Sequence, residues 1–188
     1  MLLLIIGLVM WSGLHFIPSI AISFRAQLIV QLGNAKYQLV FSVLIVASIV
    51  AMVFGWRSIE PVIIYTSPVW SAPVTSLLVL LAFILFSAAH SRSNVKRIIR
   101  HPQLTGLVIW SIGHLLSNGD NRSLILFSTL GLWAIAEIIL ISKREGDWVK
   151  PDPASMKAEL LMLAKGAVMF GIFLFAHPYI AGVPAIVR

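Results

Sequence analysis

Long apolar stretches separated by short polar connections dominate the hydrophobic pattern of this chain. A helix needs about 20 predominantly apolar residues to cross the hydrocarbon core of a bilayer. Six stretches approach that length: residues 2–22, 37–56, 73–90, 102–118, 122–142 and 157–178. The pattern therefore predicts an all-α, polytopic membrane protein with six transmembrane helices, and we expect residues 1–188 to form a single transmembrane helical domain.

Two connections and the amino terminus need separate interpretation. Residues 59–73 are apolar but contain three prolines, which lack an amide donor, so we expect this segment to lie at the outer interface with Tyr65 and Trp70 as anchors. Residues 143–153 (KREGDWVKPDP) are strongly polar and predict a cytoplasmic loop. The initial MLLLIIGLVMW has neither a basic leader nor a small-residue cleavage site, which favours a retained span over a signal peptide.

Composition supports the membrane interpretation and limits the possible chemistry. Hydrophobic residues make up 59% of the 188 residues and charged residues only 11%, outside the usual range of soluble domains. There is no cysteine, which excludes disulfides, thiolate nucleophiles and thiolate metal sites. The chain is too short for six helices and a soluble catalytic domain, so any chemistry must occur between helices or at their ends.

The basic residues predict the orientation of the helices. Cytoplasmic loops are enriched in Lys and Arg, and here these residues concentrate after the first, third and fifth apolar stretches. They are Arg25, Lys36, Arg92, Lys96, Arg97, Arg100, Lys143, Arg144, Lys150 and Lys157, against Arg57, Arg122 and Arg188 on the other side. We therefore expect both termini on the non-cytoplasmic side, and we interpret the net charge of +7 as a topology signal rather than as a sign of a nucleic-acid partner.

Four ionisable residues lie well inside the predicted spans: His15, His114, Glu137 and Lys165. Such groups are costly in a bilayer and usually face the interior of a bundle, so each is a candidate for function. Glu137 and Lys165 have similar predicted depths in their helices. They could form an interhelical ion pair, the Lys165 amine could extend along the helix to the membrane surface, or Lys165 could bind an anionic ligand group such as a propionate.

The two buried histidines occur in similar contexts, WSGLH at residues 11–15 and WSIGH at residues 110–114. Trp11 and Trp110 each precede the histidine by one helical turn and share its face. Two neutral imidazoles on different helices can bind a metal or supply both axial ligands of a haem. Alternatively, each histidine could simply form hydrogen bonds between helices.

Small residues accompany the second histidine. Gly106 and Gly113 thin the helix around Trp110 and His114. Small residues at such spacing allow close approach of either a flat cofactor or a neighbouring backbone. The sequence does not distinguish between these two possibilities.

Taken together, four segments resemble the NnrU family of bacterial membrane proteins. They are RHPQLTGLVIWSIGHLLSNGD at 100–120, SLILFSTLGLWAIAE at 123–137, LHFIPS at 14–19 and HPYIAGVPAI at 177–186. The resemblance implies a protein of the bacterial inner membrane, linked to nitrite and nitric oxide metabolism in denitrifying bacteria. A hydrophobic small molecule or nitric oxide would then be a candidate partner.

The resemblance also suggests a cofactor. The plant relative of this family, the zeta-carotene cis-trans isomerase, contains haem b, and by this resemblance His15 and His114 are the axial haem ligands. Where the plant enzyme exchanges a histidine ligand for a cysteine, this chain has Ser111 nearby, and a hydroxyl is a poor substitute for a thiolate on iron. His101 could contact a haem propionate, or HP could simply mark the start of a helix.

Two other function classes compete with a haem protein. RHPQLTG at 100–106 also resembles the stretch with which isoprenylcysteine-type membrane methyltransferases hold S-adenosylmethionine, although Leu104 stands where those enzymes have a tyrosine. A non-enzymatic assembly factor or scaffold, in which the histidines only connect helices, is equally compatible with the residues.

Overall fold

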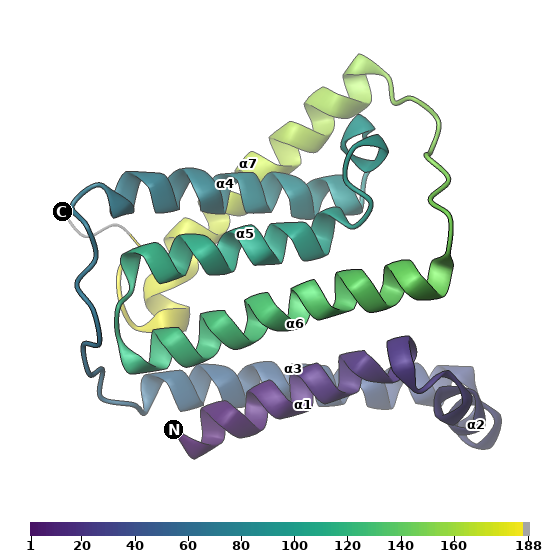
Figure 1. The fold of residues 1–188 in the computed structure, drawn as a ribbon, viewed down its shortest axis with the longest axis horizontal. Coiled ribbons are helices and arrows are strands. Elements are labelled where there is room, and N and C mark those ends of the chain that lie inside the picture. The colour runs from purple at the N-terminus through teal and green to yellow at the C-terminus, as the bar shows by residue number, and fades with distance from the viewer. Residues whose placement is uncertain (186–188) are drawn as a thin grey trace. The chain divides into compact units, whose positions relative to one another are not determined.

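The computed structural model describes residues 1–185, in which helices are joined by irregular connections (Figure 1). Arg188, expected outside the membrane, and Ile186, at the end of the 177–186 motif, lie beyond the described residues. The helices are α1 (Leu2–Ile20), α2 (Ile22–Leu32), α3 (Asn34–Arg57), α4 (Ser71–Ala89), the 3-10 turn η1 (Asn94–Arg97), α5 (Pro102–Ser117), α6 (Asn121–Glu145) and α7 (Met156–Ala181). Within residues 1–185 there is no strand beyond one isolated bridge, between Ile63 and Asp120.

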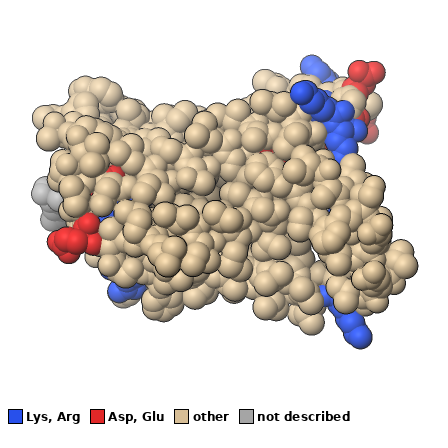
Figure 2. Space-filling model, turned by 60° about the horizontal axis from the view of Figure 1, so that its bottom comes forward, with Lys and Arg blue, Asp and Glu red and all other residues tan. Residues whose placement is uncertain are grey.

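Five of these helices are long and apolar enough to cross a membrane: α1, α3, α4, α6 and α7. Large apolar side chains also face outward, and Leu132 and Val168 are 67% and 61% exposed. Figure 2 shows a face on which charged residues form a few groups beside a broad uncharged area. The chain is therefore built as a membrane protein, as its composition predicts.

The fourth predicted span differs from the other five. It forms α5, a helix of 16 residues that lacks the length of the others. The number of crossings and the side on which each terminus lies therefore stay predictions.

Residues Met1–Glu60 form the first of two compact units. In it α1 packs against α3, and Gly7 makes the close approach possible. A Cβ at Gly7 would lie 2.8 Å from the backbone nitrogen of Met52 and the backbone oxygen of Ser48. The connection was expected to be a loop, but it contains the helix α2, which is separated from α3 by Gly33 at a φ of 78° that favours glycine.

Residues 61–188 form the second unit, in which α5 packs against both α4 and α6, and α7 crosses α4 at an angle (Figure 1). The side chain of Asp120 caps the start of α6 and that of Ser155 caps the start of α7. Phe83 of α4 contacts the rings of Phe170 and Phe173 on α7. This packing places the end of α5, with its histidine, between neighbouring elements of the same unit.

Candidate functional site

The His114 imidazole is held near the end of α5 by one hydrogen bond and three rings. Its Nδ1 lies 2.9 Å from the carbonyl oxygen of Trp110, one turn earlier in the helix. The Trp110 and Phe127 rings each lie 4.5 Å from the His114 ring, centroid to centroid, and the His177 ring lies nearly parallel to it at 6.5 Å. Trp110 and His114 share one face of α5, as their spacing predicts, and their ring planes are tilted by 45°.

The first unit contains the same local arrangement around His15. The Nδ1 of His15 lies 2.9 Å from the carbonyl oxygen of Trp11, and the two ring centroids are 4.2 Å apart. Phe41 of α3 meets the imidazole edge to face at 5.8 Å. The similar sequences WSGLH and WSIGH therefore produce similar geometry, an imidazole bonded to the carbonyl of the tryptophan before it.

These bonds decide which imidazole nitrogen carries the proton. A carbonyl oxygen can only accept, so Nδ1 of His15 and of His114 must be the donor. The Nε2 of each neutral ring then carries the lone pair that a metal ion requires. Each histidine is thus in the tautomer of a metal ligand.

His177 is a neighbour of His114 that the sequence did not reveal. Its ring lies beside that of His114, and its Nδ1 donates to the carbonyl oxygen of Val183 at 2.7 Å. Only the packing of α7 within the second unit brings these residues together. No signal in the local sequence indicates such a contact.

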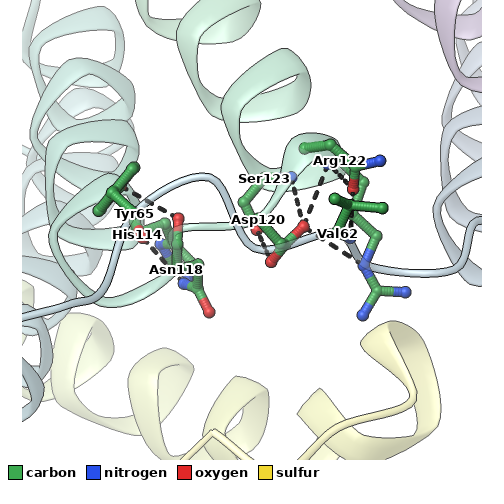
Figure 3. A network of polar contacts seen from close by, with 8 residues as sticks. Val62, Tyr65, His114, Asn118, Asp120, Arg122 and Ser123 are labelled. Atoms are coloured by element: carbon green, nitrogen blue, oxygen red, sulfur yellow. Dashed lines mark hydrogen bonds and ion pairs between the residues drawn. The ribbon is translucent and has the colours of Figure 1, made fainter.

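A strap formed by residues 61–65 fixes the end of α5 just beyond His114 (Figure 3). The Tyr65 hydroxyl donates to the carbonyl oxygens of Leu115 and Asn118, the latter at 3.1 Å. The backbone amides of Ile64 and Tyr65 both donate to the carbonyl oxygen of Gly119. Tyr65 was expected to be an interfacial anchor, but its hydroxyl is bonded to the protein itself.

Burial raises the pKa of Tyr65 above its ordinary value of 10, and the negative charge of Asp120 adds to that effect. The hydroxyl therefore keeps the proton that it donates across the neutral range. The strap is held by a neutral donor, which requires no counter-ion.

The glycines of α5 make room for α4. A Cβ on Gly106 would lie 3.0 Å from the carbonyl oxygen of Ala82, and one on Gly113 would lie 3.3 Å from the Cβ of Leu78. Thr75 of α4 donates to the carbonyl oxygen of Gly113 at 2.7 Å. Of the two possibilities that the sequence left open, close approach of a neighbouring backbone is the one that the structure shows at Gly106 and Gly113.

Asp120 organises the turn between α5 and α6. Its Oδ1 accepts hydrogen bonds from the amides of Arg122 and Ser123, and its Oδ2 accepts one from the Ser123 hydroxyl at 2.6 Å. The Arg122 guanidinium lies 3.6 Å from the same carboxylate. The sequence analysis did not identify this cap, although an aspartate before an apolar helix is a known start signal.

His101 and Arg100 join the start of α5 to the end of α6. The Nε2 of His101 lies 2.9 Å from the Ser142 hydroxyl, and Arg100 contacts the Glu145 carboxylate at 3.5 Å and the Gly146 carbonyl oxygen at 2.8 Å. Burial lowers the pKa of His101 below its ordinary value of 6.5; Glu145 opposes this effect and Arg100 reinforces it. Pro102 occupies the first turn, so the prediction that HP starts a helix is confirmed.

Lys165 and Glu137 lie apart. Glu137 is buried on α6, whereas Lys165 is exposed on α7, which packs against α4. Among the ion pairs formed by described residues, the expected pair between Glu137 and Lys165 is absent.

The structure also separates His101 and Lys165 from His114. At about 1.5 Å per residue, His101 lies about 20 Å along α5 from His114, and Lys165 lies about 18 Å along α7 from His177. The structure therefore brings His177 to His114, but neither His101 nor Lys165. Their participation in a cofactor site stays a prediction.

The chain was compared with known proteins and protein families. The family model described as NnrU protein matches residues 3–185, nearly the whole chain and parts of both units. No curated protein and no solved structure matches the chain.

Across residues 1–185, no group of three or more His, Asp or Glu side chains gathers in a way that could hold a metal ion.

Proposed function

The chain belongs to the NnrU family, and from this premise we propose that it is an integral membrane protein that binds haem b through His15 and His114. The observation that supports the proposal is the repeated bond from Nδ1 to the carbonyl of the preceding tryptophan. In this tautomer the lone pair of each imidazole is on Nε2, the atom that would bind the metal. Two such imidazoles suffice for haem, whose remaining iron ligands come from the porphyrin.

Trp11 and Trp110 would have a positioning role. Each tryptophan supplies both the carbonyl that receives the Nδ1 proton and a ring against one face of the imidazole. A ligand fixed in this way loses little rotational freedom on binding metal. Both helices thus present a preorganised imidazole.

When bound, haem b supplies one-electron redox chemistry, and the loss of one imidazole opens a coordination position for a gas or substrate. We place redox or nitric-oxide metabolism ahead of haem-dependent cis-trans isomerisation. The chain has no cysteine, and the Ser111 side chain is buried with its Cβ against Gly131 of α6. The chain therefore lacks the thiolate that the related plant isomerase uses.

Single substitutions of the two ligands test this function. Full-length protein expressed with ample haem is purified as wild type, His15→Ala, His114→Ala and His90→Ala, the last changing an exposed histidine at the end of α4. We expect haem content to fall in the first two variants and to stay at the wild-type level in His90→Ala. Haem retained equally by all four proteins would refute the ligand assignment. In a separate calorimetric titration of the wild type, binding of S-adenosylmethionine would support the methyltransferase instead.

We also propose six crossings, with both termini outside the cytoplasm of a bacterial inner membrane. At about 1.5 Å rise per residue α5 is about 24 Å long, close to a bilayer core. Because the chain has no cysteine, single cysteines can be introduced without background. An impermeant maleimide added to intact cells should label Ser67→Cys but not Asp152→Cys, and the reverse result would refute this orientation.

A further inference from the structure

A groove of about 450 Å³ lies between α4 and α7, and neither His15 nor His114 is among the residues that line it. The two helices approach closely at Gly166, where a Cβ would lie 2.8 Å from the Cα of Ile84, and Ser87 donates to the Met162 carbonyl oxygen at 2.8 Å. The groove lies beside this contact. It is the product of one tight crossing between two membrane-length helices.

The lining of the groove is mostly apolar but includes a cation. Phe86 of α4 and Val168 and Met169 of α7 form apolar walls. Polar side chains come from Lys165 of α7 and from the end of α4 and just beyond it, where Ser87, His90 and Ser91 lie. The groove therefore combines apolar walls with a cationic side chain, the combination that suits an acidic amphiphile.

Lys165 has no counter-ion on the protein. Among residues 1–185 the structure records no hydrogen bond or ion pair for its amine, and no acidic residue lines the groove. The acidic residue of α7 nearest in sequence, Glu159, is occupied by bonds from the Ser93 hydroxyl and the Asn94 amide. A lysine on a membrane-crossing helix needs an anionic or aqueous partner. The Lys165 amine can therefore bind an anion from outside the chain.

The basic loop after α4 adds to this charge. Arg92, Lys96 and Arg97 follow His90 within one short connection, and Lys96 donates to the Ala89 carbonyl oxygen at the very end of α4. Basic pockets between membrane helices attract acidic lipid headgroups. The end of the groove is therefore electropositive where a headgroup would lie.

We propose that this groove binds an acidic phospholipid of the surrounding bilayer. Its phosphate lies against Lys165 and His90, and one acyl chain follows Phe86, Val168 and Met169. This site does not depend on haem, and it gives Lys165 a role other than contact with a propionate.

The test measures lipid retained by the purified full chain in native mass spectrometry. The protein is incubated with phosphatidylglycerol or with phosphatidylcholine of identical acyl chains, as wild type, Lys165→Gln and Lys157→Gln. Lys157 is a matched control, because it is an exposed lysine of the same helix outside the groove. We expect wild type and Lys157→Gln to retain the acidic lipid in preference to the neutral one. Lys165→Gln should retain about fivefold less of the acidic lipid than wild type.

Three results would overturn the proposal. They are equal retention of both lipids by wild type, acidic lipid retained unchanged by Lys165→Gln, and an equal loss in Lys157→Gln. Lys165→Arg keeps the charge and must keep the lipid, which separates loss of charge from misfolding. If haem is bound, Lys165→Gln must leave its absorbance unchanged; loss of haem with lipid retained would assign Lys165 to the cofactor instead.

Discussion

The Tyr65 hydroxyl donates a hydrogen bond to the carbonyl oxygen of Asn118, 3.1 Å away and one turn past His114. Asn118 in turn donates from its side chain to the His114 carbonyl oxygen at 2.9 Å. A residue from an irregular, proline-broken segment thus fixes the end of the helix that presents the candidate ligand. The position of His114 therefore depends on a contact between two residues that are 53 positions apart in the chain.

Replacing Tyr65 by phenylalanine should destabilise the protein. The change keeps the ring but leaves two carbonyl oxygens of α5 without their donor, at a cost of about 1–3 kcal/mol. Thermal unfolding in detergent measures the effect. Thr66→Ala, at the exposed position directly after the strap, should leave the melting temperature unchanged, and equal behaviour of the two variants would contradict the proposed clamp.

Replacing Asp120 by alanine should loosen the start of α6. The substitution removes the acceptor of two amides and of the Ser123 hydroxyl, and loss of a helix cap costs about 0.5–2 kcal/mol. Asp120→Asn should cost less, because its side-chain oxygen can still cap the helix. Asp147→Ala, in an exposed loop, is the control for loss of an aspartate. If the Asp147→Ala protein melts at as low a temperature as the Asp120→Ala protein, the capping role of Asp120 is refuted.

Two glycines of α1 should respond differently to alanine. A methyl group on Gly7 meets the α3 backbone and should cost about 1–3 kcal/mol, whereas one on Gly13 has nothing within 4 Å. Because alanine favours a helix over glycine at both positions, Gly13→Ala should be neutral or stabilising. Thermal unfolding followed by circular dichroism compares them, and similar melting temperatures would contradict the packing of α1 on α3.

His101 should make stability depend on pH. Its pKa is lower in the folded protein than the ordinary value of 6.5 expected when unfolded, so the unfolded chain binds the proton more readily. The stability that this residue contributes is complete above about pH 6.5 and is lost as the pH falls from there toward the lower folded pKa.

His101→Gln removes this titration and should flatten the fall in melting temperature between neutral and mildly acidic pH. Gln103→Ala, an exposed neighbour on α5, should keep the wild-type slope. A His101→Gln protein as sensitive to acid as wild type would show that other groups cause the loss.

The helices were predictable because apolar length alone identifies them. The expected span at 37–56 became α3, and that at 102–118 became α5, each within a few residues. The helix α2 was missed because its 11 residues are too few to form a stretch that crosses a bilayer, the signal by which the other helices were identified. Its helical conformation depends on local backbone bonds and not on burial.

The candidate site was predictable only in its local part. The tryptophan one turn before each histidine follows from helical spacing, and the ring contacts of His15 and His114 confirm it. The Tyr65 clamp and the neighbouring His177 join residues distant in sequence, so periodicity could not indicate them. The expected pair of Glu137 with Lys165 failed for the same reason, since depth in a bilayer does not say which helices are neighbours.

The visible absorption spectrum of the purified full-length protein, oxidised and then reduced, tests the central claim most directly. Expressed with ample haem, the wild type should show a Soret band and, on reduction, the sharp bands of iron held by two imidazoles, and the His15→Ala/His114→Ala double variant should be folded but colourless. A wild type without a Soret band, or a double variant with the wild-type spectrum, would contradict haem ligation by these two residues.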